Sequence, residues 1–96
     1  MINGNITEFI DLLSYGEELV FTYREQKYFL QGWWDKDNSQ ATMVLTTVDK
    51  EKFNGYVWEC HKKNMKLCAD TFLSEPMCGT AKIFYQIQDK VTWSDW

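Results

Sequence analysis

A chain of 96 residues with 45% hydrophobic and 25% charged residues is typical of one globular domain, so we expect residues 1–96 to form a single domain. The formal net charge of −4 disfavours contact with nucleic-acid phosphates, and acidic residues outnumber basic ones in residues 1–40, which favours a basic partner. No apolar run approaches the roughly 18 residues of a membrane span, no signal peptide opens the chain, and three widely spaced cysteines are typical of reduced thiols. We therefore expect a cytoplasmic protein with no membrane role.

The first predicted element is a helix with both ends marked. Asn5 can cap its N-terminus, Glu8 completes a capping box three residues later, and Gly16 can close the helix in the left-handed conformation. The apolar residues between these ends recur at helical spacing: Ile6, Phe9, Ile10 and Leu13.

Three strands of an antiparallel meander are predicted next. Residues 17–34 alternate at period two around a turn placed at Glu25-Gln26, and residues 41–48 return after a polar turn so that Leu45 lies beside Leu30. One face of this sheet then carries Leu19, Phe21, Tyr23, Tyr28, Leu30, Trp34, Met43 and Leu45. The other carries Glu18, Val20, Thr22, Phe29, Gln31, Trp33, Thr42, Val44 and Thr46. Gly32 leaves a hollow in the first face, where a helix could approach closely.

The second half predicts one more strand and two helices. A turn signal at Asn54-Gly55 precedes a short fourth strand, and a helix with an apolar stripe through Met65, Cys68 and Phe72 follows and ends before Pro76. Residues 83–91 favour a second short helix, with a strand as the alternative, and Trp93 can tuck against the core. The fold prediction is α+β, a four-stranded antiparallel meander with an N-terminal helix and two C-terminal helices on one face (α-β-β-β-β-α-α).

The sequence contains few groups that carry chemistry. His61 is the one histidine, and its strand neighbour Cys60 should point away from it, which argues against a Cys-His nucleophile pair. A zinc site from Cys60, His61, Cys68 and Cys78 lacks the close cysteine spacing of a zinc knuckle. Nucleotide-binding and hydrolase motifs are absent. We therefore predict a protein that is not an enzyme, with no catalytic residue, metal or cofactor.

Two adjacent tryptophans end the second predicted strand. Because neighbouring strand residues point to opposite faces, Trp34 should face the helices and Trp33 should face away. In the expected register Glu18 lies across from Trp33, and a large aromatic side chain within an acidic rim is typical of a protein-binding surface. The candidate partner-binding residues are Glu17, Glu18, Trp33, Asp35 and Asp37. The alternative is that Trp93 or Trp96 covers this face as a second small core.

Two stretches carry a resemblance to a known group of proteins. "FIDLLSYGEELVFTYREQKYFL" resembles an opening helix that leads into a G-E-x-x-F-x-Y-x-x-x-x-Y hairpin, and "FLSEPMCGTAKIFYQIQDKVTW" resembles a closing F-L-x-x-P-x-x-x-G segment. The closing pattern is carried by Phe72, Leu73, Pro76, Gly79, Ile87 and Trp93, and Thr80 stands where a lysine is common. Together they cover about half of the chain, and they resemble small bacterial immunity proteins of toxin systems, including contact-dependent growth inhibition.

This resemblance implies a non-catalytic protein that binds one cognate toxin domain in the cytoplasm, often a nuclease, and blocks its active site. An acidic, aromatic-rich domain suits the covering of a basic substrate groove. The alternative function is a small regulatory or structural subunit that acts through homo- or hetero-oligomerisation, including a homodimer. A third hypothesis is a small-molecule or metal binder that uses the cysteine and histidine set.

Overall fold

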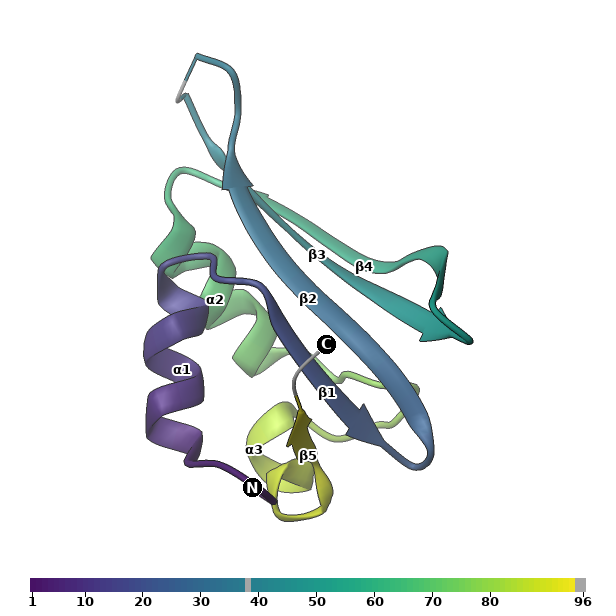
Figure 1. Cartoon of the computed structure of the whole chain (residues 1–96). Coiled ribbons are helices and arrows are strands. Elements are labelled where there is room, and N and C mark those ends of the chain that lie inside the picture. Colours follow the sequence, from purple (N-terminus) through teal and green to yellow (C-terminus); the bar gives the residue numbers. More distant parts are fainter. Residues whose placement is uncertain (38, 95–96) are drawn as a thin grey trace.

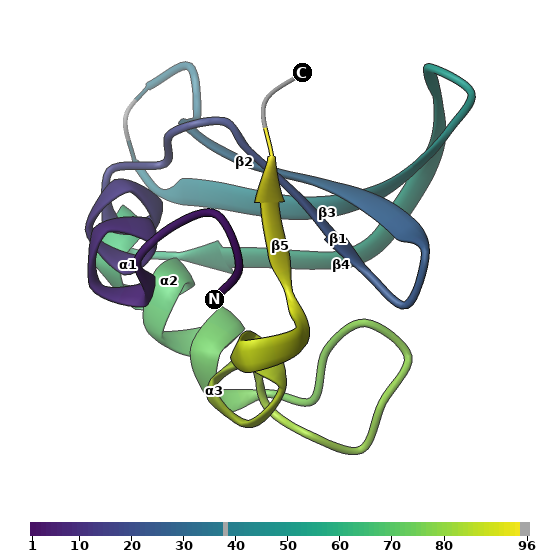
Figure 2. The same cartoon turned by 60° about the horizontal axis from the view of Figure 1, so that its bottom comes forward.

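The computed structural model describes residues 1–37 and 39–94, and it contains a five-stranded antiparallel sheet and three helices. In chain order the elements are α1 (Ile6–Ser14), β1 (Leu19–Tyr23), β2 (Gln26–Trp34), β3 (Ala41–Asp49), β4 (Lys52–Lys62), α2 (Met65–Ser74), α3 (Phe84–Ile87), the 3-10 turn η1 (Gln88–Lys90) and β5 (Thr92–Ser94). The strand order across the sheet is β4-β3-β2-β1-β5. All three helices lie on one face of the sheet (Figure 1 and Figure 2).

The predicted α+β class and the order of the first seven elements are confirmed, whereas the number of strands is not. The missed strand, β5, is three residues long and pairs antiparallel with β1, with Trp93 opposite Phe21. A strand this short has no alternation to detect in a sequence, and only its pairing with β1 makes it a strand. Trp93 does tuck against the core, as predicted, because its ring contacts Phe9 at 5.4 Å between ring centroids.

The helices form where the sequence marks their ends. The Asn5 side chain accepts hydrogen bonds from the backbone N–H groups of Thr7 (2.7 Å) and Glu8 (3.3 Å), and Gly16 takes the left-handed conformation at φ +76°. In α2 the Asn64 side chain caps in the same way by accepting from Leu67 N (2.9 Å). The buried faces of α1 and α2 consist of Phe9, Leu13, Met65, Cys68, Ala69, Phe72 and Leu73.

Both outer hairpins turn at a place that differs from the prediction. The first turn is Arg24-Glu25, not Glu25-Gln26, and the second is Lys50-Glu51, and all four residues have positive φ. Two-residue hairpin loops need positive φ at both positions, which matches the right-handed twist of the strands even without glycine or asparagine. Asn54-Gly55, the predicted turn, lies inside β4, where Gly55 (φ +99°) sits at a register irregularity. Gly55 allows a β-bulge at this point, because its positive φ lets β4 place an extra residue opposite β3.

The change of turn shifts the pairing of β1 with β2 by two residues. Leu19 pairs with Leu30 and Phe21 with Tyr28, and the latter two rings stack at 5.2 Å between centroids. Since strand faces alternate every residue, a shift of two leaves each side chain on its predicted face. The pairing of β2 with β3 follows the prediction, with Leu30 opposite Leu45.

The core lies between the helices and one face of the sheet. Its fully buried side chains include four phenylalanines, contributed by α1, β1, α2 and α3: Phe9, Phe21, Phe72 and Phe84. These rings contact one another at 5.2 to 6.0 Å between centroids. Aromatic pairs of this kind add about 0.5–1.5 kcal/mol each beyond their buried area, so they anchor the helices firmly on the sheet.

The hollow predicted at Gly32 is confirmed. A Cβ atom added to Gly32 would lie 2.5 Å from Met65 Sδ and 3.2 Å from Gly16 Cα. The side chain of Met65, the first residue of α2, therefore packs directly on the backbone of β2. The N–H of Gly32 also donates to the carbonyl of Gly16 (3.2 Å), so the end of α1 and the start of α2 meet the sheet at the same point. None of the helices within the described residues is long and apolar enough to cross a membrane.

Candidate functional site

Within residues 1–37 and 39–94, no helix covers the second face of the sheet, which we call the open face (Figure 1). Residues opposite one another in neighbouring strands share a face, so the strand register defines its members. They are Val20, Thr22, Lys27, Phe29, Gln31, Trp33, Thr42, Val44, Thr46, Val48, Phe53, Tyr56, Glu59, His61, Thr92 and Ser94. The sequence predicted this face correctly for β1, β2 and β3, apart from Glu18, which precedes β1.

The centre of the open face is a buried floor of small, mostly β-branched side chains. Thr42, Val44 and Thr46 on β3 are at most 4% exposed, although no helix lies on them. Val20, Phe29 and Val48 form a second buried cluster that is separate from the main core. Larger side chains on the flanking strands keep water from this floor, as the ring of Phe53 does where it meets Phe29 edge-on at 5.4 Å.

Large aromatic side chains stand around this floor and remain exposed. Trp33 is 38% exposed, and Phe53 and Tyr56 are each 56% exposed. A hollow of about 210 Å³ lies between Phe53 and Tyr56, with Thr46 and Gln31 also lining it. Exposed rings beside a preformed hollow are the usual components of protein-binding hot spots. The sequence prediction missed Phe53 and Tyr56 because it placed a turn between them.

The two adjacent tryptophans lie on opposite faces, as the alternation of the strand predicts. Trp33 pairs with Thr42 on the open face, and Trp34 pairs with Ala41 on the helix side. Trp34 faces the helix side, as predicted, but it is not part of the core, since 46% of it is exposed. Near its end the β2–β3 hairpin extends past the helices (Figure 1), so this ring has too little of the helix layer to pack against.

A chain of hydrogen bonds runs across the open face beside Trp33. The hydroxyl of Thr42 donates to Asp35 Oδ1 (3.1 Å) and lies 2.9 Å from His61 Nδ1, and His61 Nε2 is 2.6 Å from Glu59 Oε2. Thr42 has one hydroxyl hydrogen, so it donates to Asp35 or to His61 at any one time, and its oxygen can accept from the other where that group carries hydrogen. The chain connects the turn after β2 to strand β4 and fixes two carboxylates next to an exposed indole ring.

The predicted acidic residues are only partly brought together. Asp35 joins the hydrogen-bonded chain, and Asp37 lies exposed in the following turn, where hydrogen bonds from Ser39 hold the pKa of its carboxyl below the ordinary value. Glu18 is not across from Trp33, as the predicted register had it, because the β1 pairing begins with Leu19 opposite Leu30. The shifted turn between β1 and β2 is the reason for this difference.

Glu17 and Glu18 instead line a separate hollow of about 230 Å³ near strand β5, together with Trp93. Trp93 lies on the helix side of the sheet, so the alternative in which it covers Trp33 is wrong. Trp96, the other candidate cover, lies outside the described residues.

The cysteines and the histidine do not converge. Cys60 and Cys68 lie side by side in the core, where burial and the neighbouring Cys60 raise the pKa of Cys68 to about 11. His61 is on the opposite face of the sheet, and Cys78 follows α2. Within residues 1–37 and 39–94, no group of three histidine, cysteine or acidic side chains is arranged to hold a metal ion.

Comparison with known proteins finds no family model, no curated protein and no solved structure that matches this chain. The candidate site is therefore defined by the geometry of the open face.

Proposed function

We propose that this chain is a non-catalytic protein-binding module that uses the open face of its sheet. In its most specific form, it is a cytoplasmic immunity protein that covers the active site of a basic, nuclease-type toxin domain. The observation that carries the proposal is the helix-free face with three exposed aromatic side chains, Trp33, Phe53 and Tyr56. The resemblance of the two sequence stretches to immunity proteins supports the same function.

The chemistry of the open face suits a protein surface as the partner. Aromatic side chains are enriched in the centres of interfaces, because they bury a large area with little loss of side-chain entropy. The hollow of about 210 Å³ between Phe53 and Tyr56 has room for one side chain of a partner. Several anchors spread over one face therefore favour a broad contact.

The charges at one end of the open face favour a basic partner. Asp35 and Glu59 are held in place by the hydrogen-bonded chain beside Trp33, and Asp37 is exposed in the adjoining turn. An arginine of the partner could stack on the Trp33 ring and bind a neighbouring carboxylate at the same time. Such pairs raise the association rate and select partners with positive charge.

Oligomerisation through the edge of the sheet is the second candidate function. It is favoured by β4, which is an edge strand of 11 residues with little burial. An unpaired edge of this length can accept a strand from another chain. Antiparallel self-pairing about the middle of β4 would set Lys52 opposite Lys62 of the second copy, and like charges at facing positions destabilise such a pair. The edge is therefore a poorer candidate for a homodimer than the open face is for a different protein.

Co-expression tests the proposed function. A toxin-like domain encoded beside this gene would be produced in a heterologous bacterial host with and without the chain. We expect the chain to restore growth and to form a complex in which the Trp33 indole signal shifts in NMR spectra, whereas the Trp34 signal does not. Growth arrest despite excess chain would refute the immunity function. A stable complex that shifts the Trp34 signal and not the Trp33 signal would refute the open face as the contact surface, and a free chain that sediments as a dimer would favour oligomerisation.

A further inference from the structure

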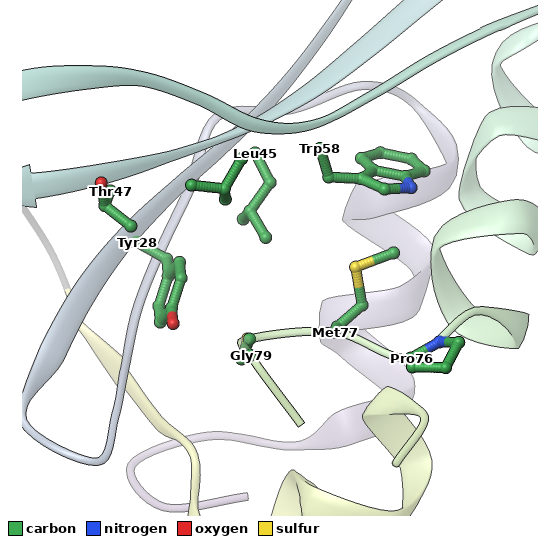
Figure 3. A pocket seen from close by; sticks show the side chains of 9 residues that line it. Tyr28, Leu45, Thr47, Trp58, Pro76, Met77 and Gly79 are labelled. Atoms are coloured by element: carbon green, nitrogen blue, oxygen red, sulfur yellow. The ribbon is translucent and has the colours of Figure 1, made fainter. Parts of the chain in front are cut away.

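A cavity of about 340 Å³ lies on the helix side of the sheet, apart from the open face (Figure 3). One wall comes from the sheet, with Tyr28 on β2, Leu45 on β3 and Trp58 on β4. The other wall is the loop that follows α2, with Pro76 and Met77. In Figure 3 the side chains of Tyr28, Trp58 and Met77 surround one common space.

The cavity exists because the loop between α2 and α3, which is held by its own hydrogen bonds, covers this part of the sheet in place of a helix. The neck of the loop is closed by a bridge between Pro76 and Ile83 and by a hydrogen bond from Met77 N to Lys82 O (3.1 Å). Inside the loop, the Thr80 hydroxyl donates to Met77 O (2.9 Å). These hydrogen bonds pair polar groups of the loop with one another, and only Met77 of the loop is deeply buried, at 3% exposed. Its one side chain lies at the wall of the cavity and does not fill it. Figure 2 shows the loop, in yellow-green, standing off from the sheet.

The size of the cavity matches a bicyclic molecule. A cavity of about 150 Å³ is enough to bind benzene in a protein core, and small-molecule sites begin at about 300 Å³. The present volume therefore admits two fused rings. The flat faces of Tyr28 and Trp58 are suited to contact with an aromatic ligand.

The lining of the cavity selects against charge. None of the side chains that line it is an acid, a lysine, an arginine or a histidine. Burial raises the pKa of the Tyr28 hydroxyl to about 12, with a further contribution from the neighbouring Cys78, and burial also raises the pKa of the Cys78 thiol to about 12. Both groups keep their hydrogen at neutral pH, and they lie within hydrogen-bonding reach of each other. When the Cys78 thiol donates to the Tyr28 oxygen, the Tyr28 hydroxyl is available to donate to a ligand. A buried ion with no counter-charge would be strongly disfavoured here, whereas a neutral ligand with an acceptor atom would not.

We infer that this cavity is a binding site for an uncharged bicyclic aromatic molecule that carries a carbonyl oxygen, which accepts a hydrogen bond from the Tyr28 hydroxyl. The site is independent of the proposed binding of a protein on the open face, because the two lie on opposite sides of the sheet.

Titration with coumarin tests the site, because coumarin is neutral, bicyclic and has one carbonyl group. A molecule of this size in a fitting cavity should bind with a Kd of about 1 mM or tighter. In NMR spectra of the full chain we expect saturable shifts of the Trp58 indole signal and of the amide signals of residues 76–80. The anionic coumarin-3-carboxylate should bind at least tenfold more weakly. No saturable shift, shifts confined to the open face, or equal binding of the anion would each overturn the inference.

A pair of matched variants tests the role of the hydroxyl. Tyr28→Phe removes the donor and keeps the ring, and we expect it to weaken coumarin binding about threefold to tenfold. Tyr85→Phe makes the same chemical change at an exposed residue of α3 that does not line the cavity, and it should leave the Kd unchanged. Equal affinities of the two variants would assign recognition to shape alone and would overturn the hydrogen bond. Because the Phe variants keep the aromatic packing, both are expected to fold, which thermal unfolding would verify.

Discussion

Replacing Trp33 by alanine provides the most direct test of the open face, because the neighbouring Trp34 is a matched control. A fully covered tryptophan buries at most about 250 Å². The 38% of Trp33 that is exposed in the free chain thus offers about 95 Å² for burial by a partner. At about 25 cal/mol per Å², Trp33→Ala should weaken the complex by about 2.4 kcal/mol, which is about 50-fold in Kd.

Trp34→Ala removes an equally large ring with a similar exposed fraction, 46%, from the other face of the same strand. Both variants lose a comparable amount of internal contact, so their free energies of unfolding in urea should fall by similar amounts. Only Trp33→Ala should weaken binding to the cognate toxin domain in calorimetric titrations. Equal losses of affinity in the two variants, or a larger loss for Trp34→Ala, would refute the assignment of the open face.

Three further predictions concern charge, hydrogen bonding and pH. Charge reversal of Asp35 and Asp37 to lysine should slow association with a basic toxin domain by about tenfold at low salt and much less at high salt, as stopped-flow kinetics would show, and a rate that is equally slow at both salt concentrations would contradict electrostatic steering. Thr42→Val should lower the free energy of unfolding by about 1–2 kcal/mol, because it removes the hydroxyl that joins Asp35 to the neighbouring histidine. Thr46→Val, on the same strand and face, should lower it by less, and urea unfolding of the two variants measures the difference. The raised pKa of Cys78, about 12 against an ordinary 9, means that the unfolded chain releases this proton first as pH rises. The contribution of the Cys78 thiol to the free energy of unfolding should therefore be fully present below pH 9 and be lost between about pH 9 and 12. Cys78→Ser should make this loss of stability shallower. A urea midpoint that stays unchanged between pH 8 and pH 10 would refute the linkage.

The alternation of apolar residues predicted the faces of the sheet well, but it could not fix every register. A turn at Glu25-Gln26 would pair Phe21 with Leu30, whereas Phe21 pairs with Tyr28 in the structure. A pattern of period two is satisfied equally by registers that differ by two residues. What distinguishes them is the stacking of Phe21 on Tyr28 and the conformation of the Arg24-Glu25 turn, and both depend on contacts across the hairpin.

The candidate site was predicted in part for a related reason. Trp33 was correctly placed on the open face, since its orientation depends only on the strand around it. Phe53 and Tyr56 were missed because Asn54-Gly55 has the composition of a turn, and the same two residues serve a bulge when the strand continues. The sequence argues against a nucleophile pair and a zinc site at His61, and it predicts no hydrogen-bond partner for this residue. Its actual contacts, Thr42 and Glu59, come from a neighbouring strand and from the second residue before it, and only the register reveals them.

The open face combines two kinds of residue whose physical roles differ. The floor residues Thr42, Val44 and Thr46 are buried within the free chain, so their replacement should affect folding before it affects binding. The exposed parts of Trp33 and Tyr56 gain nothing from folding, because water already surrounds them in the folded state. Apolar rings left in water on one face lower solubility, and the core of the protein does not need them there. A bound partner would remove this disadvantage, which is the physical reason for assigning these rings to recognition and the floor beneath them to stability.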